Sequence, residues 1–238
     1  MNLIGKGNTA EIIEQNDSSV CKLFYEGYPY SAIMREYNNA VLVQSFNLPS
    51  PKVYNITTIE NRTGIIYERL YGESILEKLF RGEYSDLLLK QITDLHKTIL
   101  NCHTNKGMSY KEFLKSCIGE RTNINAEIYN EINGLPEGTS LCHGDYHPGN
   151  IWINKSDQAL IIDFMNVCTG PWQYDVARTY VLISEGPIPE EAPNKEEISN
   201  MQRILADTYL KNMKTTYNEI SKYVSIIQKC RLYELELK

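Results

Sequence analysis

A short polar segment, residues 141–150, carries Asp145 and Asn150 in a stretch that also contains glycine and proline. Asp163 follows 13 residues after Asn150, at the end of an apolar run. The chain between them, residues 151–162, is predicted to form a hairpin, which would bring its two ends close together. Asn150 and Asp163 could then offer hard oxygen ligands to one cation, with Asp145 nearby. Oxygen ligands without a thiolate or a histidine pair indicate Mg²⁺.

Magnesium beside a carboxylate is the combination that transfer of a phosphoryl group to a hydroxyl requires. The metal would neutralise the phosphates, and Asp145 would accept or orient the hydroxyl proton. The alternative interpretation is a polar loop between two strands, in which the aspartates only form turns. We favour the catalytic interpretation because the spacing defines several positions at once and other parts of the chain match it.

The pattern His-Gly-Asp-x-x-x-x-Asn at residues 143–150, followed by Ile-Asp-Phe at 162–164, resembles the aminoglycoside phosphotransferase and choline kinase-like family. These proteins are small-molecule kinases with a protein-kinase-like fold. Protein kinases carry His-Arg-Asp in the comparable loop, then Asp-Phe-Gly. This chain has Gly144 in place of that arginine and Met165 in place of that glycine, and no Ala-Pro-Glu follows. These departures favour the small-molecule branch, while Met165 also departs from family members that have an acidic residue there.

The resemblance extends to the N-terminal part of the chain. Lys22 matches the family lysine that pairs the α- and β-phosphates, and Glu36 matches the helix glutamate that orients this lysine. From the residues alone, each could be a solvated surface residue, and Glu11 is a competing partner for Lys22. Gly5 and Gly7 lie between two short strands and could cradle a triphosphate through backbone N–H groups, although they could equally form an ordinary hairpin.

Residues 65–70 fit the strand and hinge between two lobes. The resemblance implies that the backbone of Glu68 and Leu70 contacts the edge of the nucleotide base. It places Tyr67 at the gatekeeper-like position, where a bulky residue leaves the choice between ATP and GTP open. The alternative is simply a buried strand end.

Further polar residues around the central motif are given supporting roles. His143 is expected to support the loop backbone, and His147 either touches phosphate or lines the loop. His96 is expected to be a packed helix residue. Asp175 resembles the family aspartate that braces the catalytic loop, although it could also be only a helix N-cap.

The elements that must position these residues fall into two parts. The first part is predicted to be mainly strands, with one amphipathic helix that starts near Ser31 and ends before Pro49. Its expected strands are residues 10–14, 20–24, 52–59 and 64–69, with residues 5–8 as an entry loop. Later helices are expected at residues 85–100, 110–117, 124–132 and from 172 onward, with short strands at 150–153 and 160–162.

This order predicts an α+β fold, which the resemblance identifies as bilobal and protein-kinase-like, with a β-rich N-lobe containing one inserted helix and a mostly helical C-lobe. The expected domains are residues 1–70, an N-terminal nucleotide-binding lobe, and residues 71–238, a C-terminal catalytic and acceptor-binding lobe. Crevices between lobes are preferred places for ligands.

Composition excludes several other classes of protein. The chain has 238 residues, with 30 acidic and 24 basic residues and a net charge of −6, so nucleic acid is not expected as a partner. No run of apolar residues is long enough to span a membrane, and the N-terminus has no apolar signal core. We therefore expect a cytoplasmic protein. Its six cysteines contain no CxxC pair and are read as small apolar residues. The sequence carries no signal of an oligomeric state.

The resemblance implies an Mg²⁺-dependent phosphotransferase that moves the γ-phosphate of ATP or GTP to a hydroxyl of a small molecule. Aminoglycosides, amino alcohols and sugars are the candidate acceptors. The intact phosphate-binding, catalytic and metal-binding residues speak against a nucleotide-binding regulatory module without activity. A protein kinase is the third interpretation.

One acidic segment bears on the acceptor. Residues 185–197 contain five Glu and one Lys, and such a cleft lining would concentrate a cationic acceptor. The alternative is a solvated helix start, because Asn194 and Glu197 have the spacing of a capping box.

Overall fold

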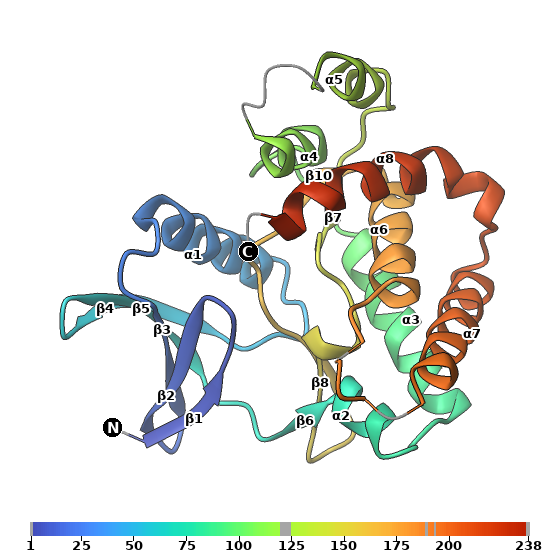
Figure 1. Cartoon of the computed structure of the whole chain (residues 1–238). Coiled ribbons are helices and arrows are strands. Elements are labelled where there is room, and N and C mark those ends of the chain that lie inside the picture. Colours follow the sequence, from blue (N-terminus) through green and yellow to red (C-terminus); the bar gives the residue numbers. More distant parts are fainter. Residues whose placement is uncertain (1, 120–124, 189, 193, 237–238) are drawn as a thin grey trace. The chain divides into compact units, whose positions relative to one another are not determined.

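The computed structural model describes residues 2–119, 125–188, 190–192 and 194–236 (Figure 1). The chain forms two compact units. One contains Met1–Glu77 and Asn150–Met165, and the other contains Lys78–Gly149 and Asn166–Lys238. The functional division predicted at residues 1–70 and 71–238 stays a prediction.

The first unit is built on an antiparallel five-stranded sheet of order β1-β2-β3-β5-β4. Its strands are β1 (Asn2–Lys6), β2 (Ala10–Asn16), β3 (Ser19–Phe24), β4 (Val53–Ile59) and β5 (Arg62–Glu68). Inward-facing residues such as Ile13, Cys21 and Leu23 form its apolar cluster. Helix α1 (Tyr30–Ser45) packs against β4 and β5 and buries Ile33 and Val43.

A smaller sheet of order β6-β8-β9 completes the first unit. It consists of β6 (Gly72–Ser74), β8 (Ile151–Asn154) and β9 (Ala159–Ile161). The β8–β9 turn is closed by the Asn154 side chain, which accepts hydrogen bonds from the backbone N–H groups of Ser156 and Gln158. The predicted hairpin between Asn150 and Asp163 is therefore confirmed.

The second unit is mainly helical. Its elements are α3 (Asp86–Leu100), α4 (Tyr110–Ile118), α5 (Asn125–Asn133), β7 (Ser140–Cys142), β10 (Cys168–Gly170), α6 (Trp172–Ser184), α7 (Lys195–Met213) and α8 (Tyr217–Glu236). A short helix, α2 (Ile75–Phe80), joins the two units along the chain, and a 3₁₀ turn, η1 (Pro148–Asn150), precedes β8. Strands β7 and β10 pair antiparallel.

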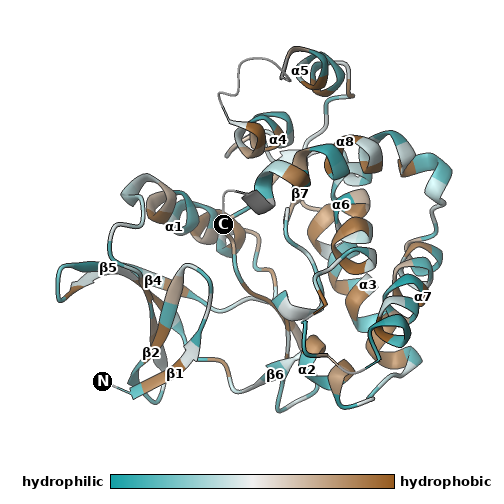
Figure 2. Ribbon diagram, viewed as in Figure 1, coloured by the Kyte–Doolittle hydropathy of each residue, from teal (hydrophilic) through white to brown (hydrophobic). Residues whose placement is uncertain are grey.

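Local capping and burial explain where these helices form. Ser85 caps α3, and Ser109 with Glu112 forms a capping box at the start of α4. Helix α6 packs against both α7 and α8 and buries Val176 and Val181 completely. Figure 2 shows brown, hydrophobic stretches along α6. The α+β class predicted from the sequence is confirmed.

The structure differs from the predicted local structure at Gly5 and Asn194. Gly5 lies within β1 and pairs with Ile12, so it is not in the entry loop as predicted. The expected capping box at Asn194 is wrong, because this residue is left-handed (φ 59°) and its side chain makes no capping hydrogen bond. The expected helix start at Ile124 and the prolines at 189 and 193 lie outside the described residues.

No helix in the described part of the chain combines the length and the apolar character that a membrane crossing needs.

Candidate functional site

Lys22 and Glu36 form a buried ion pair in the first unit. Lys22 lies on β3, and its Nζ is 2.8 Å from Oε1 and 3.0 Å from Oε2 of Glu36 on α1. The same Nζ is 3.2 Å from Oδ1 of Asp163. Glu11, the competing partner, pairs instead with Arg62 at 2.8 Å. The predicted pairing of Lys22 with Glu36 is confirmed, while its action on phosphates stays a prediction.

The neighbouring carboxylates keep the amine of Lys22 protonated. Burial disfavours the charged amine, but the carboxylates of Asp163 and Glu36 outweigh it and raise the pKa of Lys22 above its usual value. Burial raises the pKa of Glu36, against the opposing charge of Lys22. Burial also raises the pKa of Tyr67 well above its usual value. The Tyr67 hydroxyl therefore stays protonated and donates to Oε1 of Glu36 at 3.2 Å.

The two predicted metal ligands lie at the same end of one hairpin. The backbone N–H of Ile162 donates to the carbonyl oxygen of Asn150 at 3.0 Å, which closes the open end of the β8–β9 hairpin. Asp163 follows directly and has a left-handed backbone (φ 65°). Such a conformation costs a non-glycine residue about 1–3 kcal/mol, and it persists only where the surrounding structure fixes it.

Asn39 supplies part of that fixation, and the sequence analysis missed it. Its amide donates to the carbonyl oxygen of Phe164 at 2.8 Å, directly after Asp163. Asn39 lies three residues after Glu36, so both face the same side of α1. This i, i+3 spacing is the signal that could have identified it.

Asn150 and Asp163 fit a magnesium ion by the chemistry of their donors. Both offer hard oxygen atoms, and Mg²⁺ is usually held by one or two such side chains together with substrate phosphates. Within the described ranges, no three His, Cys, Asp or Glu side chains gather into a metal cluster.

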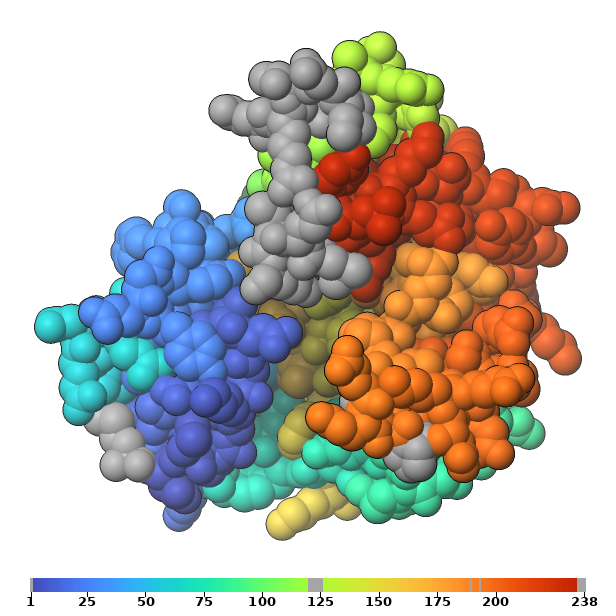
Figure 3. Space-filling view, in the orientation of Figure 1, coloured from blue at the N-terminus to red at the C-terminus, as the bar shows by residue number. Residues whose placement is uncertain are grey.

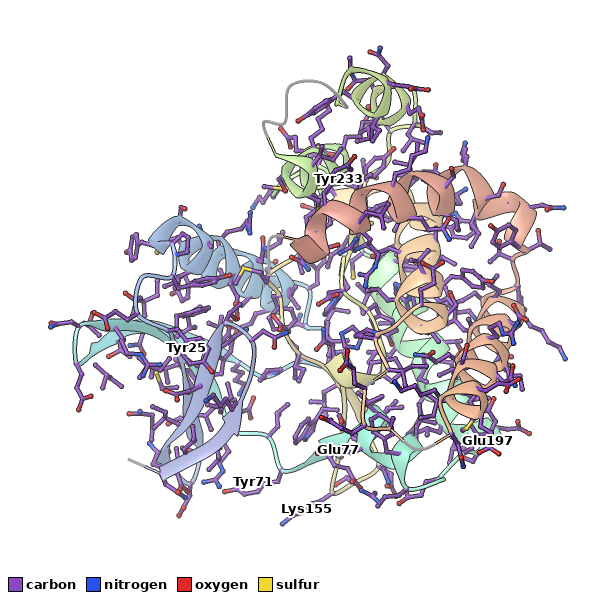
Figure 4. The ribbon with its side chains drawn as sticks, viewed as in Figure 1. Tyr25, Tyr71, Glu77, Lys155, Glu197 and Tyr233 are labelled. Carbon is purple, nitrogen blue, oxygen red and sulfur yellow. The ribbon has the colours of Figure 1, made fainter. Side chains whose placement is uncertain are left out.

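The glycine-containing turn between β1 and β2 is tight. The N–H of Gly7 donates to the carbonyl oxygen of Ala10 at 2.9 Å, and the hydroxyl of Tyr25 donates to the carbonyl oxygen of Gly7 at 2.9 Å (Figure 4). The Gly7 N–H is therefore engaged within the turn. Binding of phosphate by Gly5 and Gly7 stays a prediction.

The hinge segment is anchored on both sides within the first unit. The N–H of Glu68 donates to the carbonyl oxygen of Lys52 at 2.8 Å. The segment that contains Leu70 is followed by Tyr71, whose hydroxyl donates to the carbonyl oxygen of Asp17 at 2.8 Å and whose ring lies 5.1 Å from Nζ of Lys155 (Figure 4). Contacts of Glu68 and Leu70 with a nucleotide base stay a prediction.

In the second unit, Asp175 braces the loop that carries Asp145. Its carboxylate accepts hydrogen bonds from the backbone N–H groups of His143 (2.7 Å) and Gly144 (2.9 Å). Helix α6 begins at Trp172, so Asp175 lies inside its first turn and is not the N-cap. The predicted brace is confirmed, and the capping alternative is wrong.

His96 completes the brace. It is fully buried on α3, with Nε2 3.0 Å from Oδ2 of Asp175 and Nδ1 2.7 Å from the hydroxyl of Tyr209. Burial alone would raise the pKa of Asp175, but the hydrogen bond and charge of His96, together with the loop N–H groups, hold that pKa below its usual value. The expectation of a packed helix residue at His96 is confirmed.

Gly144 is required by the geometry of this loop. Its backbone is left-handed (φ 73°), and a Cβ atom built on it would lie 2.1 Å from the carbonyl oxygen of Asn166. No side chain fits there. This explains in physical terms why the chain cannot carry the arginine of protein kinases at this position in its present conformation.

The two histidines of the motif both contact backbone. The N–H of Asp145 donates to Nδ1 of His143 at 3.3 Å, which confirms that His143 supports the loop. The N–H of Gly149 donates to Nδ1 of His147 at 3.1 Å, and Nε2 of His147 lies 4.0 Å from Oδ2 of Asp145. His147 therefore contacts the loop backbone through Nδ1, while contact of this residue with phosphate stays a prediction.

Arg178 is a further residue of this loop that the sequence analysis gave no role. It is fully buried on α6, and its Nε donates to the carbonyl oxygen of Gly144. It lies three residues after Asp175, so the two side chains leave α6 on the same face.

The structure thus brings Lys22, Glu36 and Asp163 into contact and places Asn150 beside Asp163 in the first unit. Asp145 belongs to the second unit, in a loop braced from α6 and separated from Asn150 by four residues of chain. The roles of Asp145, Asn150 and Asp163 in catalysis and metal binding stay predictions.

Comparison with known proteins identifies the class. A model described as the phosphotransferase enzyme family matches residues 4–200. The chain therefore belongs to the phosphotransferase enzyme family, and the predicted class of enzyme is confirmed. Comparison with curated proteins gave no match.

Solved structures show the same fold. An aminoglycoside-3′-phosphotransferase of type VIII has a TM-score of 0.62 and 14% identity, over 96% of this chain and 91% of that one. An aminoglycoside phosphotransferase from Streptomyces rimosus, in complex with ADP and streptomycin, has a TM-score of 0.60 and 11% identity, over 92% and 90%. A choline kinase from Streptococcus pneumoniae has a TM-score of 0.60 and 16% identity, over 99% and 85%. The protein-kinase-like fold predicted from the sequence is confirmed.

Proposed function

We propose that this protein is an Mg²⁺-dependent small-molecule kinase that transfers the γ-phosphate of ATP to a hydroxyl group of its acceptor. The observation that carries this proposal is the contact of Lys22 with both Glu36 and Asp163, within a chain that belongs to a phosphotransferase family. A lysine held between these carboxylates matches the arrangement that binds nucleotide phosphates. The S. rimosus relative holds ADP, which favours ATP over GTP as donor.

Each residue of the site has a distinct part in the proposed reaction. Lys22 binds the α- and β-phosphates, and Glu36 holds its ammonium group in place. Asn150 and Asp163 would hold Mg²⁺, which supplies positive charge to the phosphates when bound. Asp145 orients the acceptor hydroxyl and accepts its proton.

The two parts of the chain divide these tasks. We assign nucleotide binding to residues 1–70, with Gly5 and Gly7 near the phosphates and the backbone of Glu68 and Leu70 at the base. Residues 71–238 would supply Asp145 and the acceptor site. We propose that the reaction takes place in the cytoplasm, where ATP is available.

The acceptor is proposed to be an amine-bearing alcohol or sugar of the aminoglycoside or amino-alcohol type. Two relatives of this fold are an enzyme that holds streptomycin and a choline kinase. Glu190 and Glu191 are exposed, and Figure 3 shows orange-coloured residues of this part of the second unit at the surface. Acidic side chains there would attract a cationic acceptor.

A nucleotide-binding module without turnover is the alternative function. Thermal shift measurements with ATP and Mg²⁺ separate the two when combined with turnover. Stabilisation by ATP without consumption across the whole acceptor panel would favour the module. Autophosphorylation in the absence of any acceptor would favour the protein kinase interpretation.

The decisive experiment is an ATP-consumption screen over aminoglycosides, amino alcohols and sugars, run in parallel with Asp145→Asn. A base of this kind contributes about 10²–10⁴-fold to the rate, so turnover should fall by that factor while ATP binding persists. Wild-type turnover in a folded Asp145→Asn protein would contradict the role of Asp145.

A further inference from the structure

A buried arginine contacts the loop that carries Asp145. Arg178 is fully buried, and its Nε donates to the carbonyl oxygen of Gly144, the residue directly before Asp145. The ring of Phe113 covers one face of the guanidinium, with 4.7 Å between the guanidinium carbon and the ring centroid. Burying a charge in this way is costly unless an opposite charge compensates it.

The compensating charge comes from the end of α8. Nη2 of Arg178 lies 2.9 Å from Oε1 and 3.1 Å from Oε2 of Glu234, 56 residues further along the chain. Helix α8 packs against α6, and Figure 4 labels the neighbouring Tyr233 at this end of α8. Nη1 of Arg231 lies 3.9 Å from Glu234 as well. The last turn of α8 is therefore tied to the Asp145 loop through one guanidinium group.

Only a planar group with several donors can make this connection. Nε of Arg178 donates to the carbonyl oxygen of Gly144, and Nη2 donates to the carboxylate of Glu234. Because the guanidinium is planar, these two hydrogen bonds point in fixed directions. Lysine would retain the charge but offers a single ammonium, which could not serve both acceptors in this geometry.

The contact acts on the peptide group next to Asp145. The N–H of Gly144 donates to Asp175, while the carbonyl oxygen of Gly144 accepts from Arg178. Glycine is the most flexible residue of a chain, and fixing both of its peptide groups removes that freedom. These two bonds restrain the backbone directly before Asp145, in addition to the hydrogen bond from the Asp145 N–H to His143.

We propose that Arg178 is a positioning residue for Asp145 and that Glu234 completes it, so that the end of α8 sets the geometry of the reaction centre. This inference rests on the proposed function of Asp145 as proton acceptor. Misplacement of a reacting group by about 1 Å can reduce a rate by about 10²-fold, so the effect belongs in kcat.

The test compares two ion pairs that α8 makes. Glu234→Gln removes the partner of Arg178. Glu131→Gln removes the carboxylate that Lys229 of α8 contacts at 2.6 Å, a pair that does not involve the Asp145 loop. A role in merely holding α8 in place would make the two variants alike.

Turnover is measured with ATP and Mg²⁺, using streptomycin, choline and glucose as acceptors. If none of these is phosphorylated, ATP hydrolysis, with water as the acceptor, is measured instead. We expect Glu234→Gln to lower kcat by about 10- to 100-fold with an unchanged KM for ATP, and Glu131→Gln to stay close to wild type. Arg178→Lys should have the same effect as Glu234→Gln, and the double variant should be no worse than the more impaired single variant. Circular dichroism and thermal unfolding check that each variant is folded. If Arg178→Lys does not fold, the comparison of Glu234→Gln with Glu131→Gln alone decides the result.

The outcomes separate this inference from the proposed function. An inactive Asp145→Asn together with equal kcat values for Glu234→Gln and Glu131→Gln would overturn the positioning role alone. A fully active Asp145→Asn, or a wild-type protein that consumes no ATP, would overturn the proposed function and this inference with it.

Discussion

The ammonium group of Lys22 is 2.8 Å from Oε1 of Glu36, although the two residues lie on different elements, β3 and α1. Glu36 is 1% exposed, so the pair is shielded from water. Removing one partner of a buried ion pair leaves an uncompensated charge and costs about 3–5 kcal/mol. We therefore expect the two residues to act as one unit in folding.

The first prediction concerns this unit. Lys22→Met and Glu36→Ala should each weaken turnover, and their effects should not add. Interacting neighbours differ from additivity by about 0.5–3 kcal/mol. A double-mutant cycle on kcat/KM for ATP measures this coupling. Glu11→Gln, which breaks the neighbouring pair with Arg62, serves as the control, and strict additivity of the Lys22 and Glu36 variants would show that they act separately.

The second prediction is that the hydroxyl of Tyr67 contributes to stability and to ATP binding, in addition to the packing of its ring. Tyr67→Phe keeps the ring but removes the donor to the buried carboxylate of Glu36. A hydrogen bond to a charged group contributes about 1.5–3 kcal/mol, so the free energy of unfolding should fall by that amount and ATP should bind more weakly. Denaturant unfolding and ATP titration measure both. Tyr54→Phe, on the exposed part of β4, is the control, and equal stability of the two variants would contradict the role of the hydroxyl.

The third prediction distinguishes the two proposed metal ligands. Asp163→Ala should reduce Mg²⁺-dependent ATP binding more than Asn150→Ala does, because a charged carboxylate binds a hard cation more strongly than a neutral amide. Titrations of ATP with and without Mg²⁺ test this. If the Mg²⁺ dependence of the Asp163→Ala variant equals that of the wild type, Asp163 is not a ligand.

The hairpin that joins Asn150 to Asp163 was predictable from a turn between two short apolar runs. The pairing of Lys22 with Glu36 and the brace at Asp175 followed from the resemblance to a family, because residue patterns alone do not show which elements pack together. Glu234 could not be paired with Arg178 in advance, because that contact depends on how α8 packs against α6, and a helix periodicity shows only which face is apolar.

Some errors were local and have simple physical causes. Gly5 was expected in a loop because glycine is common in turns, but the ladder between β1 and β2 continues through it to Lys6. Backbone hydrogen bonds do not depend on the side chain, so a glycine within a strand gives a misleading signal. Asn194 likewise has the right type for a helix cap, but its backbone is left-handed and its side chain makes no capping hydrogen bond.

The fourth prediction concerns the brace of the catalytic loop. The pKa of Asp175 in the folded protein lies below its usual value of 3.8. Its carboxylate therefore contributes stability that is fully present above pH 3.8 and is lost as the pH falls through the lower folded pKa. Asp175→Asn should lower the free energy of unfolding by about 1.5–3 kcal/mol at neutral pH.

The same variant should also change the pH dependence. The difference in stability between wild type and Asp175→Asn should shrink as the pH falls below 3.8, because the wild type then loses its carboxylate. Urea unfolding between neutral pH and pH 3 measures this difference. A difference that stays constant over the whole range would mean that the charge of Asp175 does not stabilise the loop.

The fifth prediction addresses the charge of the acceptor. Glu190 and Glu191 are exposed in the segment before α7, and a double change to lysine would reverse the local charge. If the segment attracts a cationic acceptor, KM for that acceptor should rise, and it should rise more at low salt, because screening is weaker there. Steady-state kinetics at low and moderate salt, with the acceptor that the screen identifies, provide the measurement.

The control is the double variant Glu60→Lys with Glu127→Lys, which makes the same change in net charge on the β4–β5 turn and on α5. It should leave KM nearly unchanged. Equal KM values for both double variants at both salt concentrations would show that residues 190 and 191 are solvated surface and do not recruit the acceptor.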